Sequence, residues 1–382
     1  MKYKLSDIFE LQMGKTPERN NKEFWDDGTE AWISISDIGK CHKYIENTSE
    51  KITQTAVNES GIKVIPKDTV IMSFKLSIGK VAITAREMYS NEAIMAFINK
   101  GIVHITPTYL YYLLKQKNWD VGTNKAVLGK TLNKATLSQI SINIHNADEQ
   151  MKIVDVLDKV SSVIENRKQQ LVEMDNLVKA RFVEMFGDIA NCSKYDGIAL
   201  GTICTTLSGG TPTTKVPEYY EGEIPWISTP YLGSNHIDGS SAKAYITEDA
   251  IENSATHLIP ANTILFGIRV GVGKSSVIDV PMCANQDIVA LMGIDTTKFN
   301  LIFLKHVLDS YQNHFDSIKK GATILGITTD DLKKVLVPTV EIEIQNQFEV
   351  FVEQIDKSKV VVQQALDEAQ TLFDSLMQEY FG

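Results

Sequence analysis

Two long stretches of the chain, residues 147–186 and 341–381, lack glycine and proline and repeat apolar residues at alternating steps of four and three. This spacing over about five heptads predicts coiled-coil helices, each about 60 Å long. Two ordinary bundle helices are the alternative, but the length and the matching register favour a coiled coil. The predicted seam residues are Ile153, Leu157, Val160, Ile164, Leu171 and Val178, then Phe348, Val352, Ile355, Val362, Leu366 and Phe373.

The rest of the chain contains an internal sequence repeat. A stretch "GKTP…WIS" near the start returns as "GGTP…WIS" at a shift of about 194 residues, and each half ends in Phe-Gly. The same shift aligns Trp32 with Trp226, Gly79-Lys80 with Gly273-Lys274, and Asn91 with Asn285. Such self-similarity predicts a duplicated fold.

Residues 266–276, "FGIRVGVGKSS", resemble a phosphate-binding loop because they end in Gly-Lys-Ser. That motif needs glycine at position 268, which is Ile268, and a strand–loop–helix context. The flanking runs "TILFGIRV" and "SSVIDV" favour strands, and Gly271 and Gly273 favour a turn between them. We therefore expect a β-hairpin here and a second one around "FKLSIGKVAI" in the first half.

These patterns predict an α+β protein with two globular α/β domains and two long helices. The expected boundaries are 1–146 for the first domain, 147–187 for the central helix, 188–340 for the second domain and 341–382 for the distal helix. Because a globular domain lies between the helices, they can pair antiparallel within one chain as a coiled coil, with one domain at each end.

Charge is distributed unevenly along the chain. The net charge is −10, but residues 1–146 carry 19 Lys and Arg against 15 Asp and Glu. Residues 188–340 have a balance of −5, and the two helical stretches have −2 and −7. The acidic total therefore does not exclude a polyanion as partner of the domains, and it mildly favours one for the first domain.

Several classes of activity leave no trace in the sequence. No Asn-Pro dipeptide occurs, so the Asn-Pro-Pro-aromatic motif of adenine methyltransferases is missing, and no Pro-Asp dipeptide begins a nuclease motif. The histidines are dispersed, and Cys41, Cys192, Cys204 and Cys283 form no zinc pattern. No run is apolar enough for a membrane span or a signal peptide, which predicts a cytoplasmic protein with reduced thiols.

The doubled architecture resembles the specificity subunit of type I restriction–modification systems. The resemblance covers the whole chain in order: a domain opening with "GKTP…WIS", a long helix ending in Phe-Gly, a domain opening with "GGTP…WIS", and a second such helix. Single motifs such as Thr-Pro are weak, whereas the two helices in matching register are more specific.

The resemblance implies a function and a set of partners. In that family each target recognition domain binds one half of a split double-stranded DNA sequence, and the coiled coil sets the distance between them. Two methyltransferase subunits dock on this scaffold and methylate adenine with S-adenosylmethionine. Restriction subunits, which use ATP and Mg²⁺, are a further partner. The specificity subunit itself is not an enzyme and holds no cofactor or metal.

Candidate DNA contacts are polar or basic residues in the repeated loops, because such side chains hold phosphates or bind base edges. They are Lys15, Thr16, Ser36, Lys75 and Lys80 in the first domain, and Thr211, Thr213, Thr229, Arg269 and Lys274 in the second. Thr-Pro and Gly-Gly also form turns, and Trp32 and Trp226 are expected in the core. Asn91 and Asn285 are expected to serve turns.

Two other functions stay open from the residues alone. A coiled-coil adaptor that binds only proteins would fit the helices, although the basic balance of residues 1–146 speaks against it. An NTPase would fit the Gly-Lys-Ser sequence only if the spacing objection were overcome.

Overall fold

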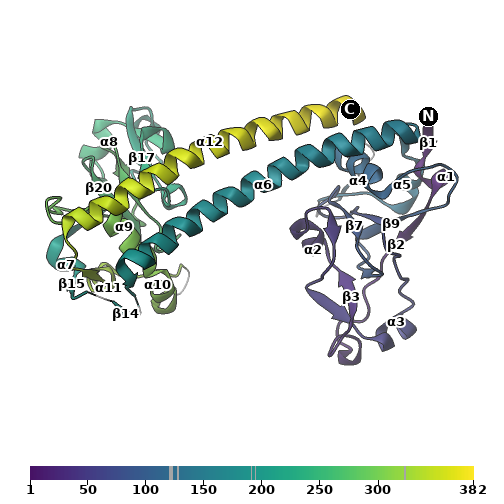
Figure 1. The fold of residues 1–382 in the computed structure, drawn as a ribbon, viewed down its shortest axis with the longest axis horizontal. Coiled ribbons are helices and arrows are strands. Elements are labelled where there is room, and N and C mark those ends of the chain that lie inside the picture. Colours follow the sequence, from purple (N-terminus) through teal and green to yellow (C-terminus); the bar gives the residue numbers. More distant parts are fainter. Residues whose placement is uncertain (120–123, 127–128, 191, 194, 322–323) are drawn as a thin grey trace. The chain divides into compact units, whose positions relative to one another are not determined.

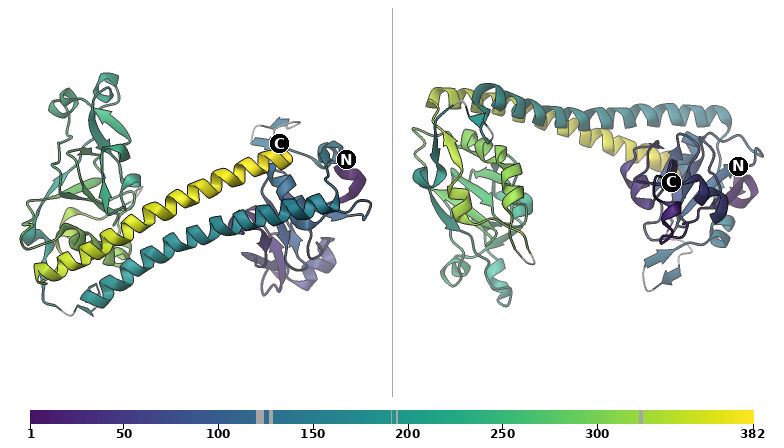
Figure 2. Two further views of the ribbon diagram at one scale, coloured as in Figure 1. Left: turned by 45° about the horizontal axis from the view of Figure 1, so that its top comes forward. Right: turned by 90° about the horizontal axis from the view of Figure 1, so that it is seen from below.

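The computed structural model describes residues 1–119, 124–126, 129–190, 192–193, 195–321 and 324–382. Its contacts divide the chain into two units (Figure 1). Unit 1 comprises Met1–Lys168 and Gln364–Gly382, and unit 2 comprises Gln169–Gln363. Both termini therefore belong to unit 1, as both views of Figure 2 show.

A five-stranded sheet forms the centre of unit 1, with the order β2-β9-β6-β7-β4. Its strands are β2 (Phe9–Met13), β9 (Ile94–Asn99), β6 (Val70–Ser73), β7 (Val81–Thr84) and β4 (Tyr44–Ile45). A three-stranded sheet comprises β5 (Glu50–Ile52), β3 (Glu30–Ile33) and β8 (Tyr89–Ser90). The short pairs are β1 (Lys2–Lys4) with β12 (Ser141–Asn143), and β10 (Asn124–Ala126) with β11 (Gly129–Thr131). The helices before the long one are α1 (Leu5–Ile8), α2 (Ile35–Lys40), α3 (Gln54–Ser60), α4 (Pro107–Gln116) and α5 (Lys134–Gln139).

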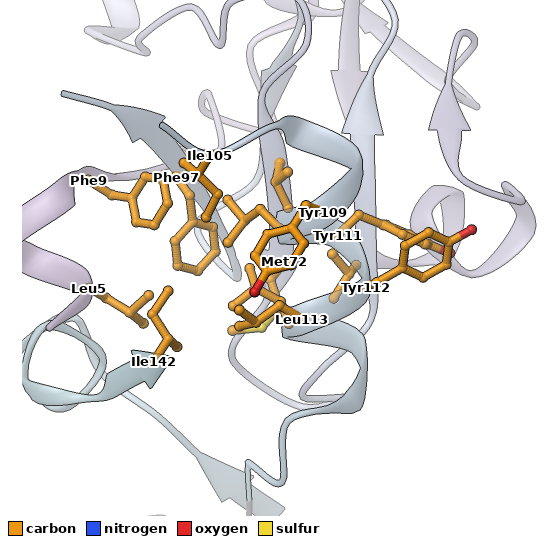
Figure 3. Packing of buried hydrophobic residues seen from close by; sticks show 14 of the residues in the cluster. Leu5, Phe9, Met72, Phe97, Ile105, Tyr109, Tyr111, Tyr112, Leu113 and Ile142 are labelled. Carbon is orange, nitrogen blue, oxygen red and sulfur yellow. The ribbon is translucent and has the colours of Figure 1, made fainter. Parts of the chain in front are cut away.

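Both faces of the central sheet are covered. Along β6, Val70 and Met72 belong to one apolar cluster, while Ile71 between them belongs to another. Successive side chains of a strand point to opposite faces, so this alternation places one cluster on each face. Figure 3 shows the larger cluster, in which α4 brings Tyr109 and Leu113 to the sheet.

Unit 2 repeats this topology. Its five-stranded sheet has the order β16-β23-β20-β21-β18, and its three-stranded sheet has the order β19-β17-β22, which match unit 1 strand for strand. The strands of these sheets are β16 (Thr205–Ser208), β23 (Ile288–Met292), β20 (Thr263–Gly267), β21 (Ser275–Ile278), β18 (His236–Ile237), β19 (Ala244–Ile246), β17 (Ile224–Ile227) and β22 (Cys283–Ala284). The other strands are β13 (Gly187–Asp188), β14 (Cys192–Ser193), β15 (Gly197–Ala199) and β24 (Leu336–Pro338). The short helices are α7 (Leu200–Ile203), α8 (Glu248–Glu252), α9 (Leu301–Ser310), α10 (Gln312–Ile318) and α11 (Thr329–Lys333). The duplication predicted from the sequence is therefore a duplication of the fold.

The two long helices are α6 (Ala147–Phe186) and α12 (Ile342–Phe381), each of forty residues. They appear as uninterrupted helices in Figure 2. In unit 1, Leu157 of α6 packs in one cluster with Phe373 of α12. In unit 2, Val178 of α6 packs in one cluster with Phe348 of α12. The first half of each helix thus meets the last half of the other, so the pair is antiparallel, as predicted.

The predicted apolar seam is interrupted. Leu171 and Val362 are half-buried and belong to neither cluster. Near them Lys359, which holds a seam position, places its Nζ 2.5 Å from Asp175 Oδ1 of α6. An ammonium group is costly to bury without a partner, and the Asp175 carboxylate supplies this partner. The seam is therefore polar at Lys359. The other predicted seam residues lie in the clusters or pack against them: Ile153, Val160, Ile164, Leu366, Val352 and Ile355.

Candidate nucleic-acid interface

The β20–β21 hairpin of unit 2 presents two basic side chains. The strands pair antiparallel, which confirms the predicted hairpin and contradicts a strand–loop–helix phosphate site. Gly271 and Gly273 adopt φ values of +74° and +91°, a left-handed conformation that glycine adopts without strain. Within the loop, Val272 is buried and its carbonyl accepts a hydrogen bond from Gln312, whereas Arg269 and Lys274 are exposed. The loop is thus held by its contact with Gln312, and its two basic side chains are accessible to solvent.

The β6–β7 hairpin of unit 1 has the same build. Phe74 is buried, and the Ser73 hydroxyl accepts a hydrogen bond of 3.1 Å from the backbone N–H of Lys80. Lys75 is half-buried and Lys80 is exposed. The Lys80 ammonium lies over Gly39 of α2, where an added Cβ would be 2.8 Å from Nζ.

A second loop of each unit packs against the turn that precedes β9 or β23, because its glycine allows close backbone contact. An added Cβ at Gly14 would lie 2.2 Å from the carbonyl oxygen of Asn91, and at Gly209 it would lie 2.2 Å from that of Asn285. The indole of Trp32 donates to the Lys15 carbonyl at 3.1 Å, and Trp226 donates to the Gly210 carbonyl at 3.0 Å. Both tryptophans are buried, as expected, and they fix these loops.

The threonines of these loops reach the start of β9 and β23. The Thr16 hydroxyl donates to the Glu92 carboxylate, and the Thr211 hydroxyl donates to the Gln286 side-chain oxygen. Burial raises the pKa of Glu92, but the Thr16 hydrogen bond and the charge of Lys75 outweigh it, so this pKa lies below its usual value. Thr16 and Lys75 therefore lie on one surface, around an ionised Glu92.

The neighbouring asparagines have the expected structural role. The side-chain oxygen of Asn91 accepts a hydrogen bond of 3.0 Å from the Ala93 N–H, and that of Asn285 accepts one of 3.2 Å from the Asp287 N–H. Each closes the turn that leads into the strand that follows.

The remaining candidates differ in their access to solvent. Lys15 is exposed and donates to the Ser60 carbonyl, Ser36 is exposed in the first turn of α2, and Thr213 is exposed. Thr229 is only 1% exposed, so the expectation that it contacts DNA is wrong. A 3₁₀ turn over Thr229–Tyr231 turns its side chain inward, toward Gly267 of β20.

The two hairpins differ in what faces the first basic residue. Arg269 lies with its guanidinium 3.7 Å from Asp287 Oδ1, whereas the position that matches Asp287 in unit 1 is Ala93. Arg269 also borders a hollow of about 450 Å³, whose lining includes Lys320, Ile324 and Asp331.

Two residues of this surface, Asp287 and Lys320, were not predicted from the sequence. The repeat alignment could have predicted Asp287, because the shift that pairs Arg269 with Lys75 also pairs Asp287 with Ala93. Lys320 could not have been predicted, since it lies in no repeated motif of the sequence.

Within the described part of the chain no three His, Cys, Asp or Glu side chains cluster as metal ligands would. Among the helices described there, none has the length and apolarity that crossing a bilayer requires. The site is therefore a set of loops with basic and hydroxyl side chains, presented twice on the same scaffold.

Such an arrangement defines a protein of two units with the same fold and different side chains at several corresponding loop positions. Residues 1–174 and 193–369 match the family model described as the type I restriction modification DNA specificity domain. The chain therefore belongs to the family of type I restriction–modification specificity proteins.

Individual relatives agree with this assignment. The chain is 27% identical over 284 residues to the type I restriction enzyme MjaIX specificity subunit of Methanocaldococcus jannaschii, a match covering 69% of the chain and 64% of the relative. It is 30% identical to the EcoR124I/EcoR124II specificity subunit of Escherichia coli over 54% of the chain and 51% of the relative. The chain thus spans less than two thirds of the length of these curated relatives.

Solved structures share the fold at low sequence identity. The S subunit of a type I system from M. genitalium superposes with a TM-score of 0.56 at 15% identity, covering the whole chain and 96% of that protein. A chain from a study of type I R-M complex assembly and conformational transition gives a TM-score of 0.61, also at 15% identity, with coverage of 100% and 97%.

Proposed function

We propose that this protein is the DNA-recognition subunit of a type I restriction–modification complex. The observation that carries the proposal is the duplicated pair of anchored loops, which offer Lys75 and Lys80 in unit 1 and Arg269 and Lys274 in unit 2. Cations on rigid loops are suited to phosphates and base edges of duplex DNA. Each unit would bind one half of a split target sequence.

The two half-sites should differ in sequence. The loops share their backbone but only some of their side chains, since Lys75 and Glu92 of one unit correspond to Arg269 and Gln286 of the other. Arginine binds guanine through two donors, whereas lysine acts as a point charge. A palindromic target would therefore contradict the proposal.

The long helices would serve as the scaffold of the complex. Two methyltransferase subunits would dock on it and methylate an adenine in each half-site with S-adenosylmethionine, and restriction subunits would add ATP- and Mg²⁺-dependent functions. In this assignment the chain is non-catalytic. The antiparallel helices would set the number of base pairs between the half-sites.

Binding of the purified complex with methyltransferase to pools of random-sequence duplex DNA tests the proposal. Selection of a split, asymmetric sequence, matched by the methyl-adenine positions in a host carrying the genes, is the expected result. A complex that assembles but selects no sequence would instead identify a coiled-coil adaptor.

A further inference from the structure

Each unit ties the edge of its central sheet to a long helix through the polar side chain of the residue before the edge strand. In unit 1 the residue before edge strand β4 is Lys43, whose carbonyl accepts a hydrogen bond of 2.9 Å from Ile83. In unit 2 the residue before edge strand β18 is Asn235, whose carbonyl accepts one of 3.0 Å from Val277. Lys43 and Asn235 thus occupy the same place in the fold.

The tie in unit 1 joins a largely buried ammonium group to a carboxylate whose side chain is 41% exposed. Lys43 places its Nζ 2.5 Å from Asp158 Oδ1 of α6, and only 12% of its side chain is exposed. The buried Tyr112 of α4 donates its hydroxyl to the same oxygen at 2.5 Å, and its ring lies 5.0 Å from the ammonium. Burial and this hydrogen bond raise the pKa of Tyr112, so the hydroxyl stays protonated as a donor. The preceding residue, His42, adds contacts to the same helix, with its Nε2 3.4 Å from both Ser161 Oγ and Glu165 Oε1.

The tie in unit 2 is made differently. The Asn235 side-chain amide donates to Asp356 Oδ2 of α12 at 2.7 Å. By the repeat, the counterpart of Asp158 is Glu353, which instead pairs with Lys357 at the surface. The carboxylates therefore do not match between the halves, although the sheet-edge donors do. Both units thus join the edge of the central sheet to a helix carboxylate, but the donor is an ammonium group in unit 1 and an amide in unit 2.

Both ties lie next to the candidate DNA loops. β4 pairs with β7, and β7 begins directly after Lys80. β18 pairs with β21, which begins directly after Lys274. Tyr112 belongs to the apolar cluster of unit 1, but Lys43, Asp158, Asn235 and Asp356 belong to no apolar cluster, so replacing one of these four should change orientation more than folding.

We propose that the contacts of Lys43 with Asp158 and of Asn235 with Asp356 are positioning contacts, which fix the angle of each recognition sheet on its helix. They thereby restrict the spacer length that the complex accepts between half-sites. This inference rests on the proposed function, because spacer discrimination exists only if both units bind DNA.

The test uses the complex of the full chain with its methyltransferase subunits. Its probes are duplexes that carry both mapped half-sites separated by the native spacer, or by one base pair fewer or more. Asp158→Asn removes the charge that Lys43 needs and keeps the side-chain shape. Asp155→Asn is the matched control, because Asp155 lies on the same helix in an exposed pair with Lys159.

Asp158→Asn should lower the preference for the native spacer about fivefold, and Asn235→Ala should do the same through unit 2. Asp155→Asn should leave it unchanged, and the half-site sequences should be unaffected in every variant. Unchanged spacer preference in both Asp158→Asn and Asn235→Ala, measured below their unfolding midpoints, overturns the inference, even if stability falls. A wild-type complex that selects no half-sites overturns the proposed function itself.

Discussion

Replacing Arg269 with alanine should weaken recognition of one half-site and leave the other intact. The Arg269 side chain is 54% exposed, and the 3.7 Å between its guanidinium and Asp287 Oδ1 is too long for a strong hydrogen bond. Its donors therefore stay accessible to a base. A two-donor contact between arginine and guanine contributes about 1–3 kcal/mol of discrimination, or roughly 5- to 150-fold in affinity.

Part of the loss in affinity would come from repulsion between the DNA and the Asp287 carboxylate. This side chain is only 14% exposed and would lose its positive neighbour. Asp287→Asn combined with Arg269→Ala in a double-mutant cycle separates this repulsion from the lost contact. The assay is competition binding at fixed salt, with duplexes changed at one base pair at a time.

Lys75→Ala is the matched control in unit 1, where Ala93 stands in place of Asp287 and the neighbouring carboxylate is instead that of Glu92. As a point charge, Lys75 should contribute evenly across sequences, and its removal should reduce the salt dependence by about one counterion. If Arg269→Ala also lowers affinity evenly, Arg269 holds phosphate rather than a base. Unchanged affinity and methylation would show that the loop is only structural.

Three further predictions concern stability and spacing. Phe348→Ala should cost about 3–5 kcal/mol in urea unfolding, because Phe348 is fully buried. Phe351→Ala should cost less, because Phe351 is only partly buried against the same cluster, and equal costs would contradict this packing. Burial and nearby lysines hold the pKa of His306 below its usual value, so the folded state binds fewer protons than the unfolded state. Stability should then fall as pH drops below about 6.5, by up to ~1.4 kcal/mol per pH unit, and His306→Leu should remove this slope; an unchanged slope would refute it. A four-residue insertion between Asn166 and Leu171, about one helical turn, should shift the preferred spacer by about one or two base pairs; methylation mapping that shows the original spacer would refute the ruler role.

The sequence predicted the elements that periodicity and repetition encode. The heptads predicted both long helices, and the alignment of Gly79 with Gly273 predicted two hairpins, because turn glycines and β-prone runs are local signals. Thr229 was assigned wrongly, since the direction of a side chain in a short 3₁₀ turn depends on what packs around it. Lys43 and Asn235 were hidden because their separation is 192 residues, so the 194-residue shift does not align them.

The core of unit 1 is closed by a piece of chain from the far end of the sequence. Phe373, Met377 and Phe381 of α12 pack there, and the repeat matches them to Phe182 and its neighbours, which close unit 2 in the same way. Two separate half-length chains could make the same contacts only by meeting in solution. Joining them in one polypeptide replaces that encounter with a high effective concentration. It also guarantees one copy of each half, so the loop residues of the two halves are free to diverge without the formation of mixed pairs.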